Sequence, residues 1–131
     1  MNETPSTEDT RERSQSLFRL TASPVIWAGH FLASYLTAAI WCAKFAEPDG
    51  SLFGVRVAIA GYTVLALVPI CAIGWDGFRR HQLGSTTVPH DFDTPEDRHR
   101  FLGFATLLLS GLSAVATVYV ALTVIFIGDC R

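Results

Sequence analysis

Residues Phe101–Ile127 have the sequence FLGFATLLLSGLSAVATVYVALTVIFI, which contains no charged side chain. A helix needs about 20 residues to cross the ~30 Å hydrocarbon core of a bilayer, so this stretch is long enough to span one. None of its faces is polar enough to lie against water. It therefore predicts a transmembrane helix.

Two further apolar runs precede it. Pro24–Phe45 holds one lysine and one histidine, and Leu52–Trp75 holds a single arginine near its start. The charged residues gather instead in Met1–Arg19 and Asp76–Arg100. Because 131 residues leave little chain outside three such helices, the sequence predicts an all-α integral membrane protein, an up-down-up bundle of three transmembrane helices in a lipid bilayer.

Capping and turn residues set the expected boundaries. Ser23-Pro24 and Thr94-Pro95 each place a capping hydroxyl before a proline at the first helical position. The third helix is expected to begin in the cytoplasm, so that its first turns extend beyond the bilayer. The expected parts are a polar cytoplasmic segment over 1–22 and a membrane domain over 23–131, with helices over about 24–46, 52–76 and 95–127 and a cytoplasmic loop over 77–94.

The basic residues predict the orientation. Lysine and arginine collect in the cytoplasmic segments of membrane proteins. With three crossings, one side of the membrane carries seven arginines and the other side three basic residues: Arg11, Arg13, Arg19, Arg79, Arg80, Arg98 and Arg100 against Lys44, Arg56 and Arg131. We therefore expect the N-terminus in the cytoplasm and the C-terminus outside. The net charge of −2 and the lack of a basic block argue against a nucleic-acid partner.

Small and hydroxyl side chains form a stripe on the third helix. They recur at spacings of three and four, which places them on one face: Gly103, Thr106, Ser110, Ser113 and Thr117. Small residues let helices approach closely in lipid, where no hydrophobic force brings helices together. We interpret the stripe as a helix-packing surface. The alternative is a hydroxyl-lined polar path, but the stripe contains no carboxylate to relay protons or bind cations.

A polar face is also expected on the first helix, looking into the bundle or toward a partner protein. It comprises His30, Ser34, Thr37, Trp41 and Lys44. A histidine within a membrane span raises the hypotheses of haem or metal ligation and of proton handling. Since no second ligand is evident, we interpret His30 as a neutral imidazole bonded within the bundle, and we expect no cofactor or metal.

The three cysteines divide between the two ends of the bundle. Cys42 and Cys130 fall at the outer ends of the first and third helices, and Cys71 falls toward the inner end of the second. We expect Cys71 to be a small buried hydrophobic residue. In an oxidising outer compartment Cys42 and Cys130 are candidates for a disulfide. Unpaired structural thiols and metal or redox chemistry at this pair remain alternatives.

The remaining polar residues suggest no chemistry. Arg56 is expected to extend to the outer interface, near Glu47 or Asp49, and a substrate-binding role is the alternative. The histidines of the loop region lack the spacing of a zinc site: His81, His90 and His99. The chain has no phosphate-binding glycine loop, metalloprotease, Cys-x-x-Cys or Gly-x-Ser-x-Gly motif. We therefore expect no catalytic residue and no enzyme activity.

Three features resemble a group of small bacterial inner-membrane proteins with three predicted helices, which are encoded beside cytochrome c oxidase subunits and assembly factors. They are Ser23-Pro24-Val25-Ile26-Trp27 followed by His30-Phe31, Trp41-Cys42-Ala43-Lys44 at the end of the first helix, and Cys130 after the third. The resemblance covers most of residues 23–131. It implies an accessory or assembly role at a haem–copper oxidase of a bacterial inner membrane, with no established activity. Together with the orientation expected from the basic residues, the expected localisation is the bacterial inner membrane, multi-pass, with a cytoplasmic N-terminus and a periplasmic C-terminus.

The expected function is that of a non-enzymatic accessory or assembly protein that binds a larger membrane complex, with a haem–copper terminal oxidase as the partner that the resemblance implies. The first alternative is copper or thiol-redox delivery at the outer membrane face through Cys42 and Cys130. A small transporter or channel subunit is the second alternative.

Overall fold

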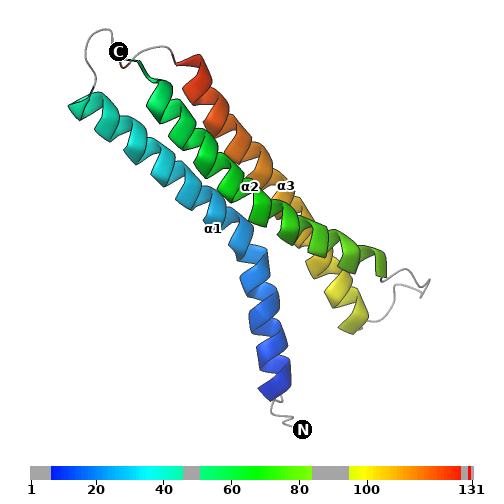
Figure 1. The fold of residues 1–131 in the computed structure, drawn as a ribbon. Helices are drawn as coiled ribbons and strands as arrows, with labels where there is room; N and C mark the ends of the chain where they lie inside the picture. The colour runs from blue at the N-terminus through cyan, green and yellow to red at the C-terminus, as the bar shows by residue number, and fades with distance from the viewer. Residues whose placement is uncertain (1–6, 46–50, 84–94, 128–129, 131) are drawn as a thin grey trace.

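The computed structural model describes residues 7–45, 51–83, 95–127 and 130. The described chain is all-helical, with α1 over Thr7–Lys44, α2 over Phe53–Leu83 and α3 over Pro95–Phe126 (Figure 1). Each helix contains a segment long and apolar enough to cross a membrane: Arg13–Lys44, Phe53–Gln82 and Arg100–Phe126. The chain is therefore an α-helical protein with three candidate membrane spans.

The start of α1 differs from the expected one. The helix begins at Thr7, so residues 7–22 are helical and Pro24 lies inside the helix instead of at its first position. The residues before Pro24 are mostly good helix formers such as Glu, Arg, Gln and Leu, which favour continuation of the helix. Pro24 deprives the Leu20 carbonyl of its N–H donor, a loss that membrane helices tolerate. Figure 1 shows that α1 changes direction, its N-terminal blue part diverging from α2 and α3, and an internal proline is a sufficient cause.

The end of α2 also differs. The helix continues to Leu83, so residues 77–83, expected as loop, are helical. Arg80 and His81 lie in its last turn, where positive charge suits the negative end of the helix dipole. The rest of the expected loop, residues 84–94, lies outside the described residues. For α3 the observed bounds agree with the expected 95–127 to within one residue.

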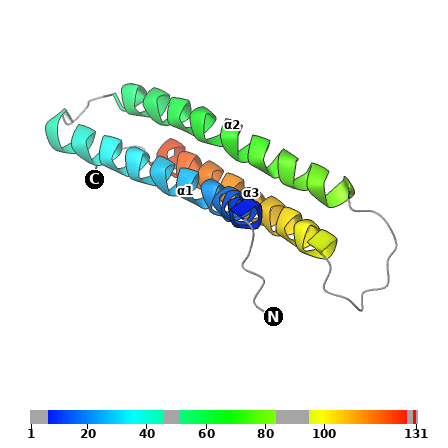
Figure 2. The ribbon, with the colours of Figure 1, turned by 90° about the horizontal axis from the view of Figure 1, so that it is seen from below.

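Many polar groups lie inside this bundle, and most of its large apolar groups lie outside. The buried hydrophobic residues are Val55, Ile59, Ala66 and Ile70. More of the buried side chains are polar: Ser23, His30, Ser34, Thr106, Ser110, Ser113 and Thr117. Leucine, valine and phenylalanine side chains cover the outside of all three helices, which is unfavourable in water but natural against lipid. All three helices pack against one another (Figure 2).

Charged residues on α2 delimit an apolar layer. Arg56 and Asp76 are 20 residues apart on this helix, a separation of about 30 Å, which is the thickness of a bilayer core. The helix between them carries no charge. Asp76 contacts Arg19 of α1, and Arg56 contacts the end of α3, so the same two levels extend to the other helices.

Candidate functional sites

α2 and α3 approach each other closely at Gly77 and Gly103. A Cβ atom on Gly77 would lie 3.0 Å from the Gly103 carbonyl oxygen, and one on Gly103 would lie 3.2 Å from the Gly77 carbonyl oxygen. One turn away, a Cβ on Gly74 would lie 3.2 Å from the Ser110 Cβ. The absence of side chains therefore lets the two backbones touch.

The five residues of the α3 stripe are all buried against neighbouring helices. Thr106 donates a hydrogen bond to the Leu102 carbonyl at 2.7 Å, and Thr117 donates to the Ser113 carbonyl at 2.8 Å. The Ser110 and Ser23 hydroxyls bond each other at 2.8 Å, which links α3 to α1. These hydroxyls are therefore engaged in bonds within and between helices.

His30 contributes the other polar link, from α1 to α2. Its Nε2 lies 3.1 Å from the Thr63 hydroxyl oxygen, and Thr63 donates to the Ile59 carbonyl at 2.7 Å. Because the hydroxyl proton is already given to that carbonyl, Thr63 accepts from His30, which fixes the proton on Nε2. The Nδ1 atom then carries a free lone pair, buried without a partner among the described residues.

The predicted polar face of α1 is not uniform in its surroundings. His30 and Ser34 are buried inside the bundle, Thr37 and Trp41 are half-buried, and Lys44 is exposed. The Trp41 ring covers the place where a side chain on α2 would stand, 3.2 Å from a Cβ built on Gly54. The face therefore lies inside the bundle at its first two residues and becomes exposed toward the end of α1.

A disulfide joins Cys42 to Cys130 across 88 residues, with their Cα atoms 5.6 Å apart. It ties the end of α1 to the chain that follows α3. The sulfur atoms in this state offer no thiolate to a metal. Among the residues that the structure describes, no three His, Cys, Asp or Glu side chains lie close enough to hold a metal ion.

Cys71 corrects one expectation. Its side chain is exposed on α2, not buried. It lines an open apolar groove between α2 and α3 together with Trp75, Phe78, Leu107 and Gly111. The reason is that a helix in lipid can turn an apolar side chain such as cysteine outward without cost, so hydrophobicity no longer predicts burial.

Arg56 lies at the same end of the bundle as the disulfide. Its guanidinium donates to the Ile127 carbonyl at 3.3 Å. Ile127 directly follows α3, where carbonyl oxygens lack helical partners and the helix dipole is negative. Arg56 thus satisfies the end of α3, while Glu47 and Asp49, its expected neighbours, lie outside the described residues.

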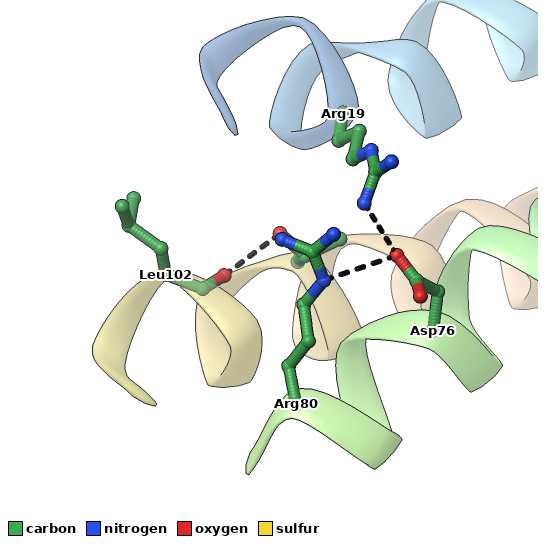
Figure 3. Close-up of polar contacts among 5 residues, drawn as sticks. Arg19, Asp76, Arg80 and Leu102 are labelled. Atoms are coloured by element: carbon green, nitrogen blue, oxygen red, sulfur yellow. Dashed lines mark hydrogen bonds and ion pairs between the residues drawn. The ribbon is translucent and has the colours of Figure 1, made fainter. Parts of the chain in front are cut away.

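At the opposite end, three charged residues converge (Figure 3). The Asp76 Oδ2 atom accepts a hydrogen bond from Arg19 Nη1 at 2.7 Å and forms an ion pair with Arg80 Nε at 3.2 Å. The sequence analysis did not single out this cluster. Asp76 and Arg80 have the i,i+4 spacing of a helical ion pair, which can be recognised in the sequence. The third member, Arg19, is 57 residues from Asp76 in the chain, so no local pattern predicts its contact.

Three aromatic rings form a ladder along α1 that was not predicted from the sequence. Trp27 and Phe31 have centroids 6.3 Å apart, and Phe31 stacks on Tyr35 at 6.4 Å. Phe31 is 45% exposed and Tyr35 62%. The spacing of four residues between these aromatic side chains indicates the ladder in the sequence, because residues four apart lie above one another on a helix. We call these three residues the α1 ladder.

No protein-family model, curated protein or solved structure matches this chain.

Proposed function

We propose that this chain is an accessory or assembly protein of a bacterial inner membrane. It crosses the bilayer three times in an up-down-up bundle, with its N-terminus in the cytoplasm and its C-terminus in the periplasm. It binds a larger membrane complex, and the partner that the resemblance implies is a haem–copper terminal oxidase. It is not itself an enzyme.

The observation that carries the proposal is the exposed part of the α1 ladder, Phe31 and Tyr35. Phe31 and Tyr35 point away from the bundle, within the apolar part of α1 between Arg19 and Lys44. No described residue bonds the Tyr35 hydroxyl, and lipid hydrocarbon offers it no hydrogen-bond partner. A neighbouring membrane helix supplies both ring contacts and a polar partner at this depth.

Photo-crosslinking tests this contact. A benzophenone amino acid is placed at Tyr35 in living cells, and in separate variants at Leu65 of α2 and Leu112 of α3, which are also strongly exposed apolar positions. We expect crosslinks to an oxidase subunit or oxidase assembly factor from position 35 and not from the two control positions. Equal crosslinking from all three positions, or none to any oxidase protein, would refute the proposal.

The disulfide favours a second candidate, thiol-redox or copper delivery at the outer face. Cys42 and Cys130 are already adjacent, and the reduced pair would offer two thiolates, the ligands that Cu(I) prefers. Copper content is measured after reduction under anaerobic conditions, with Cys42→Ser as the variant. Unchanged copper content in the variant would remove this candidate.

A further inference from the structure

The three helices line an open cavity at the end of the bundle that holds Asp76. Its volume is about 230 Å³, and its polar lining comes from every helix: Ser16 and Arg19 of α1, Asp76 and Arg80 of α2, and Thr106 of α3. Gly77 and Gly103 also line it, so the helix contact that brings α2 and α3 together leaves room beside it.

The charges in this cavity do not cancel. Two guanidinium groups face one carboxylate, and both form ion pairs with the same oxygen, Asp76 Oδ2. Each guanidinium has five N–H donors, and the contacts with Asp76 involve one nitrogen of each. The cluster therefore keeps a net positive charge and unused donors. Both arginine side chains are about half-exposed, so these donors can reach a group that enters from outside.

The position of the cavity relative to the bilayer indicates which molecule supplies the group that binds these arginines. Asp76 lies about 30 Å along α2 from Arg56, so the cavity is at the level of the lipid headgroups. Its remaining lining is apolar, including Ala72, Ile73 and Leu102, which suits the glycerol end of a lipid. Basic cavities between membrane helices at this level are suited to anionic headgroups.

We propose that this cavity binds the phosphodiester of an anionic phospholipid, such as phosphatidylglycerol, through Arg19 and Arg80. One negative phosphodiester balances the single excess positive charge, and guanidinium groups bind phosphate oxygens in pairs. Asp76 holds the two arginines together and competes with the phosphate for their donors. The site does not depend on the identity of any protein partner.

Native mass spectrometry of the purified full-length chain tests the site. The protein in mild detergent is titrated with phosphatidylglycerol, with phosphatidylcholine of the same chain length, and with inorganic phosphate. The variants are Arg19→Gln, Arg80→Gln and Asp76→Asn. The matched control is Arg79→Gln, an exposed arginine that does not line the cavity.

We expect phosphatidylglycerol to bind at least tenfold more tightly than phosphatidylcholine, and each cavity arginine variant to lose about tenfold, as for a lost charge-assisted hydrogen bond. Asp76→Asn should bind phosphatidylglycerol more tightly, a gain that a damaged fold would not produce. An equal loss in Arg79→Gln would show general surface attraction, and displacement by equimolar inorganic phosphate would show a free-anion site. Either result, or weaker binding by Asp76→Asn, overturns the proposal.

Discussion

Replacing Gly77 by alanine is expected to weaken the contact between α2 and α3. The added Cβ would lie 3.0 Å from the Gly103 carbonyl oxygen and 3.2 Å from the Leu107 nitrogen, nearer than the ~3.5 Å at which non-bonded carbon atoms attract best. Both neighbours are helix backbone atoms, so the helices must separate. Overpacking of this kind costs about 1–3 kcal/mol, while alanine gains about 1 kcal/mol over glycine in helix propensity. The expected net loss is about 0–2 kcal/mol.

Gly111→Ala provides the matched control, because a Cβ there meets nothing within 4 Å. It receives the same propensity gain without the clash, so the two variants should differ by about 1–3 kcal/mol in the free energy of unfolding. The assay is equilibrium unfolding of purified protein by sodium dodecyl sulfate in mild detergent, followed by tryptophan fluorescence. If Gly77→Ala unfolds at the same denaturant fraction as Gly111→Ala, the backbone contact at Gly77 is refuted.

Two further predictions concern the polar links and the cysteines. Thr63→Val leaves the buried His30 Nε2–H without its acceptor and should lower the free energy of unfolding by about 0.6–2 kcal/mol in the same assay. The control, Thr123→Val, removes an exposed hydroxyl that is bonded only to its own helix, so it should cost less. Equal losses in the two variants would contradict the His30–Thr63 bond. In spheroplasts, a membrane-impermeant maleimide should label Cys42 and Cys130 only after an impermeant reductant has been added. Labelling before reduction would contradict the disulfide, and labelling only in lysed cells would contradict the proposed orientation.

Much of the fold could be predicted because membrane spans depend on a local property, the length of an uncharged apolar run. Each of the three runs lies within one helix except for a single residue at one end, and α3 has nearly the expected bounds. The α3 stripe is buried for a similarly simple reason. Small residues at spacings of three and four share one face, and the buried residues of α3 recur at this same spacing.

The features of the structure that were not predicted depend on competing local preferences or on tertiary packing. Ser23-Pro24 is a good helix start, but it also fits inside a helix, and only the preceding residues decide between the two. The convergence of Arg19 on Asp76 depends on how α1 packs on α2, which no local pattern encodes. The exposure of Cys71 depends on which face of α2 is turned to lipid. Propensity and spacing cannot supply these tertiary facts.

Two parts of α1, its last turn and the turn at Arg19, are held to the other helices by interactions of very different strength. This difference relates the disulfide, the α1 ladder and the charged cavity to one another. A covalent bond fixes its last turn through Cys42. Near Arg19 it is held by an ion pair whose side chains are almost half-exposed, and such pairs contribute about 0–1 kcal/mol. Pro24 lies between the two, where the helix lacks a backbone hydrogen bond. Ser23 is itself held by its buried hydrogen bond to Ser110. The part of α1 before Ser23 can therefore shift at small energetic cost while the α1 ladder stays anchored, so a headgroup that binds Arg19 and Arg80 would also set the angle between this part of α1 and the rest of the bundle.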